Sequence, residues 1–571
     1  MKFKKNIISA AIILATMTLT ACDSSDDDKN VAPTDITLSS NSVLENTSNT
    51  VIGTLSATDE NSTDTFTFTV SDERFTVVGN ELTLAENTVF DYETEQSIDI
   101  EVVVTDSGAL SFTKTLTIEI TDALDTYAFD SKFITDDSSV SYTGQIARHA
   151  LIAELAHYIG NDLKSELDDG TLMSRDAVIA KLNKYYRTSD LQYDNFPITF
   201  MSAKQTYITD ISSSPKNLSG KMAGNDTGGQ HKDWNDGEFA GWGTKGSTTP
   251  EGLIDILFGQ LADNAEQHLN GVVRQSVTGD DITKVYLNSD GTDLKQLIQK
   301  LLLVGITYSQ ATDDYLGHET EGKGLTTDNI GQDGGSNPYS TLEHQFDEGF
   351  GYFGATPDYL AYSDTEIAGK VTSDDNGRSD WNGKHDSNND GEIDLTSEVI
   401  FGIAANAAKR DLGTASNTSP TDYTAQIMNA FISGRKIIND NVGSALSTQQ
   451  LEDLKAQRDI IADGWERALA TTVVHYINEV HSDLSKFGTD DFNFEDTAKH
   501  YSELKGFALG LQFNPYSKVT DEQFQQFHTL VADKPVLDSE DNVTAYQVNL
   551  LAARDIIETA LSLDNENVQN W

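Results

Sequence analysis

Apolar and polar residues alternate along the first part of the chain, in short runs separated by turn residues. Gly79 and Asn80 stand between two such runs, where a hairpin turn is expected. The alternating apolar positions are Phe66, Phe68 and Val70, then Ile98, Ile100, Val102 and Val104, and finally Leu116, Ile118 and Ile120. Because successive side chains of a strand point to opposite faces, this pattern predicts an antiparallel β-sandwich over residues 33–122.

Beyond Tyr127 the apolar residues recur every three or four positions, which is the period of an amphipathic helix. The clearest runs are Ile152, Leu155, Ile159 and Leu163; Leu253, Leu257, Leu261 and Leu269; and Leu451, Leu454, Ile461, Trp465, Leu469 and Tyr476. Loops rich in glycine and aspartate separate them at residues 214–249, 321–339 and 371–394. The sequence therefore predicts a multidomain α and β protein, in which a mainly α-helical domain with long loops, residues 127–571, follows the β-sandwich.

The N-terminus has the layout of a bacterial export signal. A lysine-rich start precedes an apolar run from Ile7 to Leu19, which is too short to span a membrane. The run ends in Leu19-Thr20-Ala21-Cys22, which resembles the lipobox of bacterial lipoproteins. The resemblance implies that residues 1–21 are a signal peptide and that Cys22 carries acyl chains such as palmitate. The chain would then be lipid-anchored in the cell envelope, facing the periplasm or the cell surface. The alternative is that Cys22 is a buried free thiol.

Charge and cysteine content narrow the classes of partner. The chain has 91 acidic and 39 basic residues and a formal net charge of −52, which argues against nucleic acid as a partner and favours cations near the surface. A salt-adapted surface explains this charge as well as a cation-collecting role does. Cys22 is the only cysteine, so no internal disulfide can form. Residues 22–32 are polar and acidic, which predicts a flexible tether behind the lipid.

Several short phrases within residues 32–122 resemble those of a bacterial cadherin repeat. They are Ala32-Pro33-Thr34-Asp35, Leu44-Glu45-Asn46, Ala57-Thr58-Asp59, Asp91-Tyr92-Glu93 and Val104-Thr105-Asp106-Ser107-Gly108. Cadherin repeats bind calcium through such carboxylates at the joints between modules. The resemblance implies a calcium site toward the next domain, formed by Glu45, Asp91, Glu93, Asp122 and Asp125. It places three further residues at the opposite end, namely Asp59, Asn61 and Asp106. Alternatively, these side chains only cover the strand ends.

The segment from Asp386 to Asp394 has the spacing of an EF-hand calcium loop. Oxygen-bearing residues hold positions 1, 3 and 5, and Gly391 holds position 6, where a tight turn is required. Position 12 is Ser397 instead of an acid. The predicted calcium ligands are Asp386, Asn388, Asp390, Glu392, Asp394 and Glu398, with Asp394 or Glu398 closing the shell. The alternative is an ordinary turn rich in Asp and Asn.

Two longer phrases in the helical region resemble a family of bacterial lipoproteins of unknown function. They run from Leu342 to Gly354 and from His500 to Pro515, within a likeness that covers residues 127–571. That family is in turn remotely similar to the imelysins, which are tied to iron uptake. Imelysins carry a Gly-x-His-x-x-Glu motif; with its histidine at His344, Asp347 stands for its glutamate and its glycine is not matched. The resemblance implies a role in iron or metal acquisition.

Histidines and acids within these phrases have the spacing of neighbours on one helix face. Asp347 and Glu348 follow His344 by three and four residues, and Glu503 follows His500 by three. If two helices bring these five side chains together, the set can bind iron or another transition metal. The same side chains can instead make local hydrogen bonds beside an aromatic core. Further pairs of this kind are His475 with Glu479 and His318 with Glu319.

The sequence lacks the common catalytic and nucleotide-binding motifs. The Gly-x-Ser-x-Gly, His-Glu-x-x-His and phosphate-loop patterns are absent, so an enzyme is not favoured. The favoured hypothesis is an extracytoplasmic calcium-binding lipoprotein that acts as a surface or periplasmic binding protein in iron or metal acquisition, with an uptake-system partner. The alternatives are a calcium-dependent adhesion protein with a cell-surface partner, and a metallohydrolase that uses the His344 set on one ion.

Overall fold

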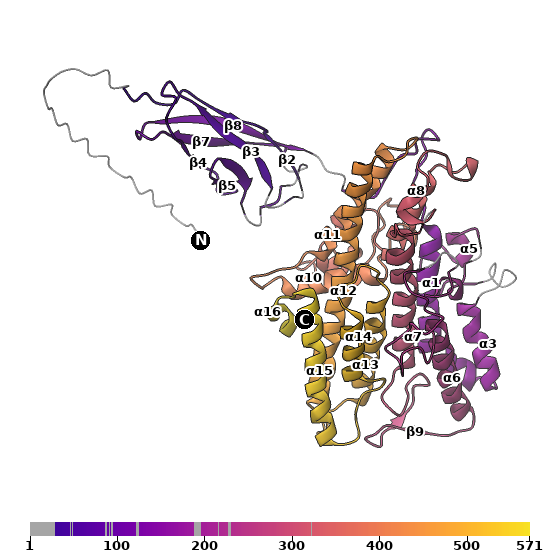
Figure 1. Ribbon diagram of the computed structural model, residues 1–571. Coiled ribbons are helices and arrows are strands. Elements are labelled where there is room, and N and C mark those ends of the chain that lie inside the picture. Colours follow the sequence, from indigo (N-terminus) through magenta and orange to yellow (C-terminus); the bar gives the residue numbers. More distant parts are fainter. Residues whose placement is uncertain are drawn as a thin grey trace. The chain divides into compact units, whose positions relative to one another are not determined.

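The computed structural model describes residues 29–571 apart from short gaps (Figure 1). The gaps are residues 46, 48, 49, 86, 87, 91, 93, 94, 122–124, 188–195, 215, 227–229 and 321. The predicted signal peptide, Cys22 and the tether up to residue 28 lie outside the described residues. The chain divides into two compact units, Met1–Ala123 and Leu124–Trp571.

The N-terminal unit is a sandwich of two four-stranded sheets. One sheet has the order β1 (Asp35–Leu38), β3 (Val51–Thr58), β6 (Glu81–Leu84) and β5 (Phe75–Val78). The other has the order β2 (Ser42–Leu44), β8 (Ser111–Thr121), β7 (Ser97–Thr105) and β4 (Thr67–Val70). All neighbouring strands pair antiparallel except β2 and β8, which are parallel. The β part of the predicted fold class is therefore confirmed.

Alternation along the strands produces the core of this unit. Every second residue of β7 is buried, namely Ile98, Ile100, Val102 and Val104. The same core includes buried residues of the facing sheet, among them Ile36, Leu55 and Leu82. Burial of each such side chain contributes about 1.5–3 kcal/mol. The hairpin between β5 and β6 turns at Gly79, whose φ of +67° is a conformation that glycine adopts without strain.

The C-terminal unit is mainly helical, which confirms the rest of the predicted fold class (Figure 1). Its described α-helices are α1 (Thr143–His157), α2 (Leu163–Asp168), α3 (Arg175–Tyr186), α5 (Ile208–Ile211), α6 (Pro250–Leu269), α7 (Leu294–Leu302), α8 (Thr341–Phe353), α9 (Asp364–Ile367), α10 (Gly402–Thr414), α11 (Tyr423–Asp440), α12 (Thr448–Leu484), α13 (Phe494–Ala508), α14 (Asp521–Val531), α15 (Glu540–Leu561) and α16 (Asn565–Asn570). A two-stranded ribbon, β9 (Arg274–Gln275) and β10 (Asp281–Ile282), follows α6. Among the described helices, none combines the length and the apolar character needed to cross a membrane.

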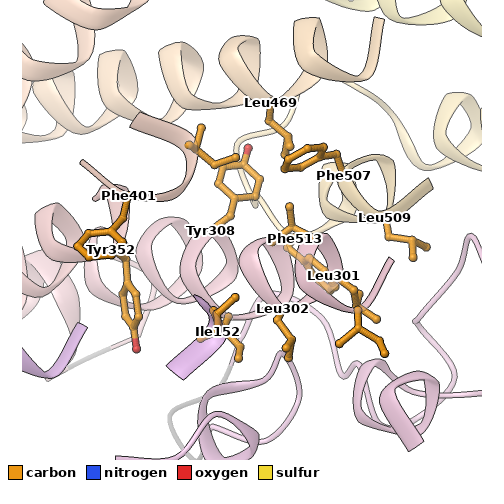
Figure 2. Packing of buried hydrophobic residues seen from close by; sticks show 14 of the residues in the cluster. Ile152, Leu301, Leu302, Tyr308, Tyr352, Phe401, Leu469, Phe507, Leu509 and Phe513 are labelled. Atoms are coloured by element: carbon orange, nitrogen blue, oxygen red, sulfur yellow. The ribbon is translucent and has the colours of Figure 1, made fainter. Parts of the chain in front are cut away.

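Helix α12, with 37 residues, packs against α10, α11, α13 and α15 and so forms the axis of this unit. A capping box begins it, in which Ser447 and Gln450 each accept a backbone N–H of the other. On its buried face, the ring of Trp465 lies 5.1 Å from that of Phe353 of α8 and 5.5 Å from that of Tyr308. Figure 2 shows part of this core, including Tyr308, Leu469, Phe507 and Phe513.

The chain leaves α-helical geometry directly after α7. It continues through two π-helical segments, η3 (Leu303–Tyr308) and η4 (Gln310–Tyr315), and a similar segment, η1 (Tyr158–Asp162), follows α1. A π turn holds more residues than an α turn, so side chains beyond it are rotated relative to the helix before it. The apolar spacing of the sequence did not predict these segments.

Candidate functional sites

Three carboxylates gather at one end of the β-sandwich. Asp59, Asp64 and Asp106 each offer one oxygen, and these atoms all lie within 4.8 Å of one another. Asp59 directly follows β3 and Asp106 directly follows β7, so two strands of different sheets bring them together. No other three His, Cys, Asp or Glu side chains are this close in the part of the chain that the structure describes. This group, the acidic corner, is the best-formed candidate for a cation site among the described residues.

Local hydrogen bonds hold the acidic corner in place. Asp106 accepts the backbone N–H of Leu110 at 2.8 Å and the side-chain amide of Asn30 at 3.1 Å. The Oδ2 atoms of Asp59 and Asp64 are buried and accept no hydrogen bond. None of the ion pairs formed between described residues includes any of the three acids. Calcium prefers several hard oxygen ligands of this kind, so the corner has the chemistry of a calcium site.

The sequence placed Asp59, Asn61 and Asp106 at one end of the β-sandwich, and the structure brings the two aspartates together there. The backbone N–H of Asn61 donates to Asp59 at 2.8 Å, so Asn61 supports the loop. Sequence reasoning missed Asp64, which lies five residues after Asp59 in the same loop. A second acid within one turn-rich loop was the signal that could have found it.

The other predicted end of the β-sandwich is only partly described. Glu45 is buried, and its Oε2 accepts the backbone N–H of Tyr92 at 2.6 Å. Asp91, Glu93 and Asp122, predicted to share a calcium ion with Glu45 and Asp125, lie outside the described residues. The structure thus shows one of these acids fixed by the backbone, and a calcium site at this end stays a prediction.

The segment from Asp386 folds as a tight loop of the expected shape. The carboxylate of Asp386 accepts the backbone N–H groups of Asp390 and Gly391, at 3.1 and 2.8 Å. Asn388 accepts the N–H of Asp390 at 2.8 Å. Gly391 has a φ of +86°, which explains why glycine stands at the sixth position. The oxygen-bearing side chains at positions 1 and 3 therefore organise the loop backbone, while Glu392 is exposed.

Protein groups occupy the rest of this loop. Glu398 is buried and closes the two ends, since it accepts the N–H of Ser387 at 2.9 Å and that of Asp394 at 2.8 Å. The ammonium of Lys204 lies 3.3 Å from an oxygen of Asp390 and 3.9 Å from one of Asp394. These carboxylates raise the pKa of Lys204. A lysine thus supplies positive charge to this loop, and a calcium ion there would have to displace it.

The structure places Asp347 in a buried ion pair. The Nε of Arg435 donates to its Oδ1 at 2.7 Å, and both side chains are fully buried. His344 instead bonds to the carbonyl of Ser141 through Nδ1 at 3.1 Å, and its Nε2 lies 4.0 Å from Glu348. Because Arg435 and its neighbours use the oxygens of Asp347, the predicted metal set of His344, Asp347 and Glu348 is not assembled.

His500 and Glu503 of α13 line a cavity together with His475 and Glu479 of α12. The cavity has a volume of about 640 Å³. Sequence reasoning paired His500 and Glu503 with the His344 set, whereas the structure joins them to the third His–acid pair. The side chains of this cavity do not form a group of three metal-ligand atoms as close as the acidic corner, which is the one such group among the described residues.

The two cavity histidines differ in their electrostatics. Burial and the nearby Arg410 lower the pKa of His475 to about 3, so its ring is neutral at pH 7. A hydrogen bond from Nδ1 to Asp483, at 2.8 Å, raises the pKa of His500. The cavity also contains Lys409 and Arg410 of α10, which sequence reasoning missed. Cations at a metal site repel the metal, so these residues favour a different ligand.

Comparison with known proteins identifies one family. Residues 125–365 match the family described as "Domain of unknown function (DUF4856)". This confirms the expected unknown-function domain for that part of the helical unit. No curated protein matches the chain. A solved structure, the crystal structure of the protocadherin GammaB4 extracellular domain, is similar over 20% of this chain and 19% of that chain, with 24% identity and a TM-score of 0.15. The match therefore spans about a fifth of the protocadherin chain.

Proposed function

We propose that this protein is an extracytoplasmic calcium-binding lipoprotein, held to a membrane through a lipid on Cys22 and carrying calcium in the acidic corner of its β-sandwich. The observation that supports this most is the closeness of Asp59, Asp64 and Asp106, which form no ion pair with any basic side chain that the structure describes. The three negative charges repel one another and so destabilise the corner. A bound divalent cation would attract all three carboxylates and so replace this repulsion with a net attraction. The net charge of −52 adds to this by concentrating cations at the surface.

In this proposal the helical unit is the binding part of a surface or periplasmic protein that serves iron or metal acquisition. The basis is the lipobox-like N-terminus and the remote likeness to imelysins. A bare transition ion bound by His344 is not favoured, because Asp347 is paired with Arg435. The same ion pair argues against the metallohydrolase hypothesis, which relied on Asp347 as a ligand. Calcium-dependent adhesion is the second candidate, since the acidic corner belongs to the cadherin-like unit.

Calcium titration by calorimetry tests the first part of the proposal. We expect the full-length chain to bind calcium and Asp64→Asn to weaken this binding about tenfold or more, because one charged ligand is lost. Asp106→Asn is a second variant, and Asp99→Asn is the matched control. Asp99 lies on β7 and contacts Thr117, so its change removes the same charge from the same unit away from the corner. Equal affinity in Asp64→Asn, Asp106→Asn and Asp99→Asn contradicts the proposal.

Fractionation of cells tests the lipid anchor. We expect the wild-type chain to sediment with membranes and to lose residues 1–21. Cys22→Ser removes the acylated thiol, so the variant chain is expected in the soluble extracytoplasmic fraction or to retain its signal peptide. A wild-type chain that keeps its first residues and stays in the cytosol overturns this part of the proposal.

A further inference from the structure

The cavity between α10, α12 and α13 is lined by more basic than acidic side chains, whereas the whole chain is strongly acidic. The whole chain has more than twice as many acidic as basic residues. The cavity lining has four basic side chains against two carboxylates, Glu479 and Glu503. The basic ones are Lys370, Lys409, Arg410 and Lys499. A local positive surface of this kind, in a strongly acidic protein, focuses anions into the cavity.

Arg410 is the most unusual member of this lining. Its side chain is only 6% exposed, and its Nε is buried without a hydrogen-bond partner. Neither Arg410 nor Lys409 takes part in any ion pair formed between described residues, whereas nearby Lys300 pairs with Glu503 and His500 pairs with Asp483. Burying a guanidinium without a counter-ion lowers the free energy of unfolding, so Arg410 is expected to destabilise the folded protein.

The backbone of Arg410 is fixed independently of its side chain. Its carbonyl accepts the indole N–H of Trp571 at 2.9 Å, and the position lies within helix α10. The helix and Trp571 therefore fix the backbone of Arg410 beside the cavity, and no ion pair formed between described residues engages its guanidinium. A cation of this kind can bind an anionic ligand without first breaking an internal ion pair.

The electrostatics of the neighbours agree with an uncompensated positive region. Burial, together with the nearby cations Lys300, Lys370 and Arg410, lowers the pKa of Lys409 to about 8. Burial lowers the pKa of Arg410 to about 10, against the opposing effects of Tyr476, Asp411 and Glu479. The cavity carboxylates thus do not offset the burial of these two cations.

We propose that this cavity binds a small molecule through a carboxylate or phosphate group, which pairs with Arg410 and Lys409. The planar guanidinium matches either group with two parallel hydrogen bonds, and the ammonium of Lys409 adds a point charge. The volume of about 640 Å³ suits a metabolite-sized ligand. Glu479, which takes part in no ion pair formed between described residues, is left to accept a hydroxyl or ammonium group of the same molecule, whereas Glu503 pairs with Lys300. The cavity shares no residue with the acidic corner, so this site and the calcium site stand or fall separately.

Calorimetry and thermal unfolding of the full-length chain test this site. The probes are citrate, succinate and inorganic phosphate, with glycerol as the uncharged comparison and ferric citrate to separate a free carboxylate from its iron complex. We expect at least one anion to bind and to raise Tm, and Arg410→Gln to weaken that binding about tenfold or more. Without ligand, Arg410→Gln is expected to unfold at the same or a higher temperature, because it removes an unpaired buried charge.

Two further variants make the result decisive. Lys409→Gln is expected to weaken binding of the same anion and to leave calcium binding unchanged. Arg175→Gln is the control, because Arg175 pairs with Asp263 and neither residue lines the cavity. This variant is expected to leave anion binding unchanged. If no anion gives heat or a Tm shift with the wild-type chain, the proposal fails. It also fails if Arg410→Gln binds anions as tightly as the wild type, or if it lowers the Tm of the ligand-free protein as a structural arginine would.

Discussion

Arg435 of α11 donates to Asp347 of α8 at 2.7 Å, in a position where neither side chain is exposed to solvent. A second nitrogen of the same guanidinium donates to Glu343 at 2.7 Å. The hydroxyl of Tyr127 donates to Asp347 at 2.8 Å, so the segment before α1 joins the same network. One arginine thus ties three parts of the helical unit together through two carboxylates.

Breaking this network should destabilise the helical unit strongly. Arg435→Met leaves two buried carboxylates without their counter-ion, so we expect the free energy of unfolding to fall by about 3–5 kcal/mol. Urea denaturation followed by circular dichroism measures this. Lys436→Met is the control, because Lys436 pairs with Asp440 on the solvent side of the same helix, where a change of about 0–1 kcal/mol is expected. A similar effect of both variants would show that the buried network adds little.

Glu466 predicts a pH dependence of stability. It is fully buried on α12, hydrogen-bonds with Ser517, and burial raises its pKa from 4.5 to about 7. The folded state therefore holds a proton that the unfolded state releases, so this stability is complete below pH 4.5 and is lost as pH rises through 7. Because each pKa unit corresponds to about 1.4 kcal/mol, Glu466 should account for a loss of up to about 3 kcal/mol in the free energy of unfolding between pH 4.5 and 7. We expect this loss to be absent in Glu466→Gln.

Unfolding curves between pH 4 and 8 measure this effect. The wild-type chain and Glu466→Gln should differ in slope, with the variant relatively more stable at the upper end. Glu452→Gln, an exposed change at the start of the same helix, should keep the wild-type slope. A wild-type slope in Glu466→Gln would mean that Glu466 is not the titrating group.

We expect Lys204 to oppose calcium binding at the loop that begins with Asp386. Its ammonium lies 3.3 Å from Asp390, where a calcium ion would also have to lie close. Lys204→Met frees two carboxylates, so we expect it to increase the rise in Tm that calcium produces in the helical unit. Lys164→Met removes a comparable exposed pair with Asp168 and should have no effect. If calcium changes the Tm of neither the wild type nor Lys204→Met, the loop is a turn organised by its own hydrogen bonds and not a calcium site.

Transition-metal content should not depend on His344. Its ring stacks on Tyr339, with 4.7 Å between ring centroids, and bonds to the Ser141 carbonyl. We expect elemental analysis to give the same iron and zinc content for the wild type and His344→Ala. A loss of either metal in His344→Ala would revive the metal site predicted from the sequence.

The sequence predicted those features that depend on near neighbours in the chain. The strand residues Ile98 to Val104 are buried in alternation as expected, and Gly391 makes the turn that its position required. In both cases the physical cause acts within a few residues, through strand geometry or the freedom of glycine at positive φ. Such features need no knowledge of the tertiary fold.

The features that the sequence did not predict depend on distant partners. Arg435 lies 88 residues from Asp347, so nothing in the local spacing of His344, Asp347 and Glu348 revealed the ion pair. The pairing of His500 with the His475 region follows from how α12 and α13 pack, which apolar periodicity does not fix. Arg410 was missed because a lone basic residue on a helix gives no signal until its lack of a partner is seen.

Hydrogen exchange with and without calcium tests the central claim most directly, since it locates bound ions along the chain. If calcium fills the acidic corner, exchange should slow at the loop that includes Asn61 and at Leu110, whose amides donate to Asp59 and Asp106. The strand centres of β7, away from the corner, should change little. Exchange rates in these two loops that stay the same at saturating calcium would contradict the account.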